Sequence, residues 1–191
     1  EMYSKDISKK VHSSYLLKAQ KGQFTGCLAP FGYRKDPEDK NHLLIDEETA
    51  PIVRRLFAWA LEGHGPNYIR RRLEEEKIPC PTYWNRIRGL RNVSTKWEKK
   101  DPVNGRYMWD FSVIKDILMN PVYTGAIASQ KKEYRFKIGT IGEKKPEEWI
   151  VVENQHEPLV DRKTFDIVQR KLKSRQRPRQ TGEISLFAGL I

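Results

Sequence analysis

The residues most able to do chemistry are basic and aromatic side chains that alternate between positions 82 and 109. Guanidinium and ammonium groups pair with phosphates, and planar rings can stack or brace a loop against sugars. We therefore expect phosphate contacts here. The alternative is a solvated basic loop with its tryptophans in the core, which we favour for Trp109. The basic residues are Arg86, Arg88, Arg91, Lys96, Lys99, Lys100 and Arg106, and the aromatic ones are Tyr83, Trp84, Trp97, Tyr107 and Trp109.

Two flexible basic arms, residues 18–25 and 170–179, could reach into a narrow groove of DNA. Arginines on an extended arm suit the minor groove, where the negative potential is concentrated. A tail that only aids solubility is the alternative for the second arm. The basic residues are Lys18 and Lys21 in the first arm and Arg175, Arg177 and Arg179 in the second.

Two predicted helices, residues 66–77 and 111–119, resemble a helix-turn-helix in which a long insertion replaces the usual turn of about 3–4 residues. The second helix would enter the major groove, where its outward side chains could read base edges or phosphates. Ordinary packing of two helices explains the same pattern and stays open as the alternative. The outward residues are Ser112, Lys115, Asp116 and Asn120.

No set of residues in the sequence has the context of a catalytic or metal site. There is no Ser/His/Asp or Cys/His arrangement and no glycine-rich phosphate loop. Cys27 and Cys80 lie outside any C-x-x-C pattern, and each histidine stands alone. We expect no catalytic centre, metal or cofactor, and reduced cysteines in a cytoplasmic protein; a hydrolase with an unrecognised site is the alternative.

The chain has 191 residues, enough for one large domain or two small ones. Its 36 Lys and Arg against 25 Asp and Glu give a formal net charge of +11. Such an excess favours a polyanionic partner, most commonly nucleic acid, although a merely soluble basic protein is the alternative. No apolar run approaches the roughly 20 residues of a membrane span, so we expect no membrane partner.

The hydrophobic pattern predicts an α+β fold: a long first helix, then a helix-rich domain with the helix-turn-helix-like pair and a small antiparallel sheet. One narrow apolar stripe on the first helix predicts a neighbour along a single seam. Helices are predicted over 3–21, from Thr49 to 61, over 66–77, from 110 or 112 to 119, and from Asp161 to 172. Strand candidates are 31–34, 43–45, 123–130, 134–138 and 149–152, with a hinge at 22–26, an irregular segment at 82–109 and a turn at 139–142.

Several phrases, in this order along nearly the whole chain, resemble the middle portion of large serine recombinases. These are the resolvase-like integrases and transposases of phages and mobile elements. Each phrase is a weak signal alone, and the shared order makes the resemblance specific. The phrases are Tyr3–Val11, Ala29–Tyr33, Ile45-Asp46 before Val53–Phe57, Gly63–Leu73, Ile117–Gly125 and His156–Val160.

The resemblance implies three parts. Residues 1–26 are similar to the end of the helix and hinge that follow the catalytic domain. Residues 27–175 are similar to the recombinase DNA-binding domain, and 176–191 to the approach to a zinc-ribbon domain. The nucleophilic serine of such proteins would lie upstream of Glu1, so no catalytic or metal residue is carried over to this chain.

The function implied is sequence-specific binding of double-stranded DNA at attachment or transposon-end half-sites. That binding would position a serine recombinase for integration or excision. The full-length protein would be a homodimer or tetramer, in the cytoplasm of a bacterium or phage-infected cell and associated with the nucleoid. The alternative is a protein-interaction module that assembles the synaptic complex, with incidental charge.

Overall fold

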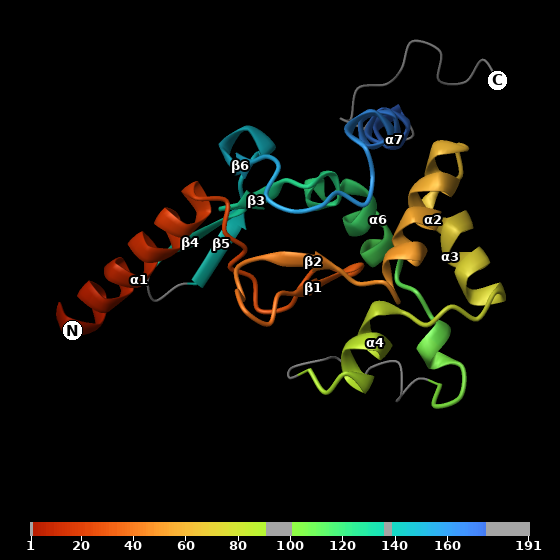
Figure 1. The fold of residues 1–191 in the computed structure, drawn as a ribbon, viewed down its shortest axis with the longest axis horizontal. Helices are drawn as coiled ribbons and strands as arrows, with labels where there is room; N and C mark the ends of the chain where they lie inside the picture. The colour runs from red at the N-terminus through yellow and green to blue at the C-terminus, as the bar shows by residue number, and fades with distance from the viewer. Residues whose placement is uncertain (1, 91–100, 136–138, 175–191) are drawn as a thin grey trace, which may run out of the picture.

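The computed structural model describes residues 2–90, 101–135 and 139–174, and it confirms the predicted α+β class (Figure 1). The α-helices are α1 (Met2–Gln20), α2 (Ala50–Leu61), α3 (Pro66–Glu75), α4 (Pro81–Ile87), α6 (Phe111–Met119) and α7 (Arg162–Ser174). The strands are β1 (Tyr33–Lys35), β2 (Leu43–Ile45), β3 (Ile127–Ser129), β4 (Lys132–Arg135), β5 (Gly139–Glu143) and β6 (Ile150–Val152). Short 3-10 helices η1, η2 and η3 span Gly105–Tyr107, Pro121–Thr124 and Pro146–Glu148.

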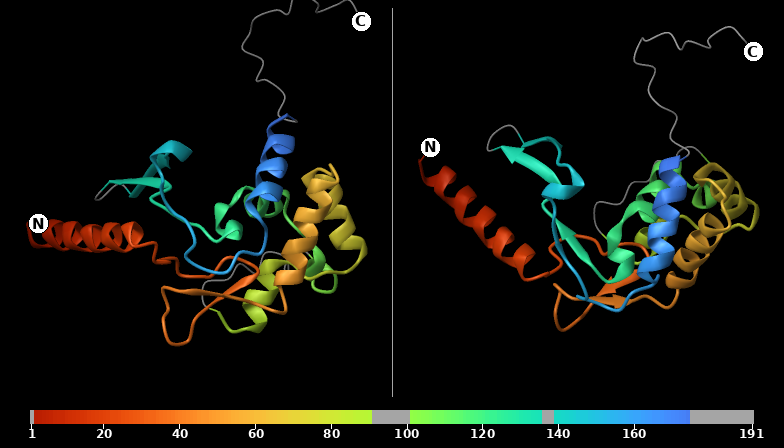
Figure 2. Two further views of the ribbon diagram at one scale, coloured as in Figure 1. Left: turned by 45° about the horizontal axis from the view of Figure 1, so that its top comes forward. Right: turned by 90° about the horizontal axis from the view of Figure 1, so that it is seen from above.

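The core lies among α2, α3, α6 and α7, which gather at one end of the molecule (Figure 2). Each helix contributes an apolar face at helical spacing, as the sequence predicts. Burying these side chains removes apolar surface from water, which is the main favourable term in folding. The most deeply buried of them are Val53, Leu56 and Phe57 of α2, Ile69 and Leu73 of α3, Ile114 and Leu118 of α6, and Val168 of α7.

Helix α2 begins and ends where its sequence predicts. Thr49 is its N-cap residue, and Pro51 lies in the first turn, where no backbone donor is needed. After the helix ends, Gly63 has φ +99°, a left-handed conformation that disfavours residues with a Cβ. The predicted start at Thr49 and stop at Gly63 are therefore confirmed.

Within the described residues, the strands form three two-stranded antiparallel sheets, β1–β2, β3–β6 and β4–β5. The predicted turn at 139–142 is wrong, because these residues begin β5 and pair with β4. The two glycines suggested a turn there. The connection between the two strands is residues 136–138, which lie outside the described part. The predicted strand at 123–130 is also shorter, because Asn120 caps η2 and only Ile127–Ser129 is extended.

The segment predicted to be irregular contains a helix. Pro81 is the first residue of α4, and its fixed φ suits a helix start. The Cys80 N–H donates to the Arg106 carbonyl at 2.8 Å, which joins the start of α4 to η1. Trp109 is 3% exposed and donates its indole N–H to the Ile78 carbonyl, so its predicted place in the core is confirmed.

Helix α1 projects from the sheet side of the molecule, away from the helical core (Figures 1 and 2). Among the side chains of its predicted stripe that the structure describes, Ala19 is buried, whereas Ile7, Val11 and Tyr15 are 45%, 48% and 50% exposed. The expectation of one covered seam is therefore wrong for most of the described helix. Val11, Tyr15 and Ala19 border a cavity of about 1020 Å³, whose far wall comes from β3, β4 and β6.

Candidate nucleic-acid interface

One side of α6 faces solvent while the other side is in the core. At about 100° per residue, Ile114, Ile117 and Leu118 fall on the buried side. The remaining arc is continuous and exposed, and it carries side chains that donate, accept or make apolar contact. Its residues are Phe111, Ser112, Lys115, Asp116 and Met119.

Packing at both ends fixes α6 in place. Trp109, just before the helix, is held in the core by its hydrogen bond to Ile78. At the other end, the Gln169 side chain of α7 donates to the Leu118 carbonyl at 2.7 Å. The helix therefore presents its outer face from a rigid platform, which a site for recognition requires.

Asn120, predicted to read a base edge, already has partners. Its side-chain oxygen accepts from the Val122 N–H at 3.3 Å and from Lys131 Nζ at 3.2 Å. Burial lowers the pKa of Lys131, although Asp116 opposes the shift, and the ammonium lies 5.0 Å from the centre of the Trp149 ring. In this geometry Asn120 positions the end of α6, and its contact with bases stays a prediction.

Arg88, predicted to contact phosphate, is turned inward to two carboxylates. Its guanidinium is 2.7 Å from Asp46 and 2.5 Å from Glu48, across about 40 residues of sequence. Burial of the Asp46 carboxyl would raise its pKa, but hydrogen bonds from Arg88 and Thr49 hold that pKa below its usual value. This partly buried ion pair joins the end of α4 to the residues just before α2.

The other predicted residues of this segment divide into two groups. Arg86 is exposed on α4, and Arg106 is half-buried with its guanidinium 4.9 Å from the Tyr107 ring centre. The second group lies outside the described residues: Arg91, Lys96, Lys99 and Lys100 with Trp97, and Arg175, Arg177 and Arg179 of the second arm.

The two predicted arms are partly helical. Lys18 belongs to α1, and Lys21 follows that helix with its N–H donating to the Leu17 carbonyl. Residues 170–174 are the last turn and a half of α7, so the prediction of a flexible arm is wrong for them. The amphipathic pattern of Phe165, Val168 and Leu172 continues the helix through this stretch. Figure 1 places the end of α1 beside β3 and β6, apart from α4 and α6.

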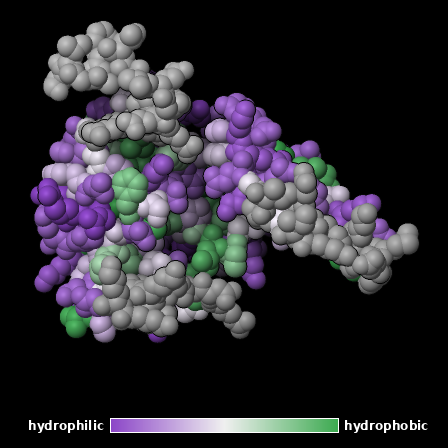
Figure 3. Space-filling view, turned by 180° about the vertical axis from the view of Figure 1, so that it is seen from behind, coloured by the Kyte–Doolittle hydropathy of each residue, from purple (hydrophilic) through white to green (hydrophobic). Residues whose placement is uncertain are grey.

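Sequence reasoning missed the apolar members of the exposed α6 face, Phe111 and Met119, and the half-buried Lys131. Their signal was present: Phe111, Lys115 and Met119 recur every four residues, on a stripe separate from that of Ile114 and Ile117. Figure 3, which views the molecule from behind, shows apolar side chains scattered among hydrophilic ones, and a hollow between the helical part and α1.

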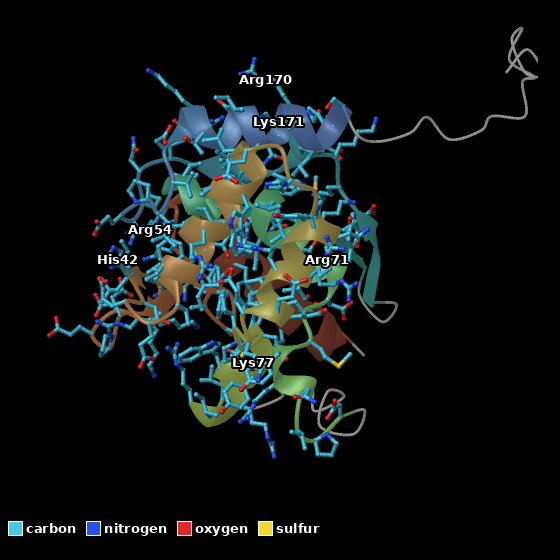
Figure 4. The ribbon with its side chains drawn as sticks, turned by 90° about the vertical axis from the view of Figure 1, so that its right-hand side faces the viewer. His42, Arg54, Arg71, Lys77, Arg170 and Lys171 are labelled. Carbon is cyan, nitrogen blue, oxygen red and sulfur yellow. The ribbon has the colours of Figure 1, made fainter. Side chains whose placement is uncertain are left out.

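The outer surface of α3 is charged but internally balanced. Arg70, Arg71 and Arg72 lie 3.1, 3.7 and 3.3 Å from Glu74, Glu75 and Glu76 respectively, each four residues away. Arg55 of α2 also pairs with Glu76. Figure 4 shows this side of the molecule, with further basic side chains from Arg170 and Lys171 of α7 down to Lys77.

Two negative findings apply to the described ranges 2–90, 101–135 and 139–174. No group of His, Cys, Asp or Glu there could hold a metal ion. No helix in the same ranges is long and apolar enough to cross a membrane.

Comparisons with known proteins agree with the fold. "Uncharacterized protein YefB" of Bacillus subtilis (strain 168) is 37% identical over 86 residues, 44% of this chain and 28% of that protein. A structure described as "Crystal Structure of a LSR-DNA Complex" matches with TM-score 0.54 and 15% identity, over 91% of this chain and 42% of that one. Another, "Sequence Requirements of the Listeria innocua prophage attP site", has TM-score 0.53 and 17% identity, over 86% and 51%.

The chain thus spans less than a third of the Bacillus protein and about half or less of the chains in those structures. A family model described as Recombinase matches residues 47–175. That match covers more than half of the chain and bears out its resemblance to serine recombinases: the chain belongs to the Recombinase family.

Proposed function

We propose that this chain binds duplex DNA and positions a serine recombinase on its attachment half-sites. The observation that carries the proposal is the exposed face of α6, in which Ser112, Lys115 and Asp116 stand on a helix anchored at both ends. An α-helix fits the major groove, about 12 Å wide, where hydroxyl, ammonium and carboxylate groups can read base edges. Membership of the Recombinase family supports this assignment.

Phosphate contacts are proposed for side chains around α6. Arg86 is exposed on α4, and Lys131 donates to Asn120 at the end of α6; both carry positive charge. Contacts to phosphate set the register of a protein on DNA without reading sequence. The net charge of +11 supports contact with phosphate. The predicted contacts of 91–100 and 175–179 extend this proposal.

The proposed arrangement has residues 27–175 as the DNA-binding unit, with 1–26 leading from a catalytic domain and 176–191 leading toward a zinc ribbon. The phosphodiester chemistry of integration or excision would belong to that catalytic domain. This role implies a cytoplasmic, nucleoid-associated protein. The similar solved structure described as an LSR-DNA complex supports the partner proposed here.

Salt dependence tests the proposal. The chain would be titrated against duplexes that it selects from a random-sequence pool, with fluorescence anisotropy as the readout. Six to ten phosphate contacts predict an affinity loss of about 10³–10⁵-fold between 50 and 200 mM salt. Selection of no duplex, or binding indifferent to salt, would overturn the proposal.

One observation favours the alternative, a module that assembles the synaptic complex through protein contacts. The apolar side chains Val11 and Tyr15 of α1 line the cavity and are half-exposed. Replacing Val11 and Tyr15 by serine should then abolish self-association in sedimentation, with duplex affinity unchanged. Under the leading proposal the same variant binds duplex normally, and unmodified chain shows salt-sensitive DNA binding as a monomer.

A further inference from the structure

We propose that α6 selects thymine through its 5-methyl group, using Phe111 and Met119. This inference rests on the proposed function, because it assumes that the outer face of α6 meets the major groove. It adds a specificity that charge and hydrogen bonding do not supply. The chemical class recognised is a duplex with thymine at two defined positions.

Two large apolar side chains lie on the solvent-facing surface of α6. Phe111 and Met119 are 43% and 40% exposed, on either side of Lys115. Three other apolar residues of the same helix, Ile114, Ile117 and Leu118, are buried. Leaving a large apolar side chain half in water forgoes the favourable free energy of burial. A partner that covers both side chains would recover it.

The charge and chemistry of the surrounding side chains favour DNA as that partner. Lys115 lies between the two apolar side chains, and Lys131 lies beyond the end of the helix. The thymine methyl is the apolar group that the major groove offers, and apolar side chains are its usual contacts. A surface with ammonium groups beside apolar side chains therefore suits phosphate and thymine methyl together.

The spacing makes the proposal specific. Eight residues separate Phe111 from Met119, a rise of about 12 Å along a helix. Successive bases of one strand rise about 3.4 Å, so the two side chains reach positions about three to four base pairs apart when α6 lies along the groove. We expect two methyl-sensitive positions at that separation.

Replacing thymine by deoxyuridine removes only the methyl group. Duplexes selected by the chain from a random pool would be resynthesised with deoxyuridine at one thymine at a time. We expect about a fourfold weaker affinity at each of two positions, the effect of one buried methyl-sized group. Phe111→Ala should remove the sensitivity at one position and Met119→Ala at the other, as in a double-mutant cycle.

Controls separate readout from folding and from general binding. Leu61→Ala removes a comparably exposed apolar side chain from α2 and should leave affinity and the thymine preference unchanged. Lys115→Ala should weaken both forms of the duplex without changing their ratio. Phe111→Leu, which keeps an apolar side chain, should retain part of the preference even if Phe111→Ala fails to fold.

The results distinguish failure of this inference from failure of the proposed function. Equal affinity for thymine and deoxyuridine duplexes, with strong salt-sensitive binding, would overturn the thymine proposal alone. Absence of any duplex binding would remove both. If instead Phe111→Ala and Met119→Ala abolished self-association in sedimentation, the two side chains would belong to an interface between copies of the chain, and the thymine proposal would be wrong.

Discussion

Helices α3 and α6 pack against each other in the same core, yet their outer surfaces differ in kind. The surface of α3 carries Arg70, Arg71 and Arg72, each paired with a glutamate one turn later. The exposed face of α6 carries few charges and includes hydroxyl, ammonium and apolar groups, and no other described helix covers it. The number of arginines therefore does not locate a DNA-binding surface, because paired arginines offer phosphate little net charge.

The largest expected effect is on stability, and it tests the hydrophobic core that α3 and α6 share. Leu73 of α3 and Leu118 of α6 are fully buried, so each Leu→Ala variant should lower the free energy of unfolding by about 2–5 kcal/mol. Urea unfolding measures both losses. A loss under about 1 kcal/mol for either variant would contradict the shared core described here.

The next effect concerns the ion pair of Arg88, at the end of α4, with Asp46. Arg88→Ala leaves the buried Asp46 carboxylate without its ion pair, and we expect a loss of about 1–3 kcal/mol in stability at neutral pH. The pKa of Asp46 is lowered in the folded chain, so this contribution is present above the unfolded pKa and is lost as pH falls through the folded one. Acid unfolding should therefore begin at a higher pH in the variant. Unchanged acid unfolding would show that the pair does not form in solution.

The same residues show what sequence could and could not give. Periodicity predicted α2, α6 and α7, because their apolar faces meet one core, and the order of family-like phrases predicted the family. The pairing of Arg88 with Asp46 joins residues 42 apart, and nothing local to Arg88 signals it. The helix at 81–87 was missed because its residues form no clear apolar stripe, and β5 because glycines at 139 and 142 suggested a turn.

A smaller effect comes from a histidine in the core. Burial lowers the pKa of His156, whose ring also bonds the Val122 carbonyl at 2.8 Å. The folded chain therefore favours the neutral ring. The stabilising contribution is full above the unfolded pKa of about 6.5 and falls as pH drops toward the folded value. Urea unfolding should give lower stability at pH 5.5 than at 7.5. His156→Gln should reduce that difference, whereas His12→Gln on exposed α1 should not.

The smallest effect is on the surface of α3. Glu75→Gln removes one exposed partner of Arg71 and should cost only about 0.3–0.5 kcal/mol in stability, since exposed pairs of this spacing are weak. Arg71 would then be less neutralised, yet specific duplex affinity should not change, because α3 is not the reading surface. A change of tenfold or more in that affinity would contradict the assignment of DNA reading to α6 and not to α3.

Tethered cleavage tests most directly whether α6, and not α3, meets DNA. After Cys27→Ser removes the exposed thiol, Lys115→Cys or Arg71→Cys would carry an iron chelate that cuts nearby DNA; Cys80 is buried. We predict that the chelate at 115 cuts one short stretch of a selected duplex, in a major-groove pattern, and that the chelate at 71 cuts nothing above background. Cuts from 71 alone, or equal cuts from both positions, would contradict the account.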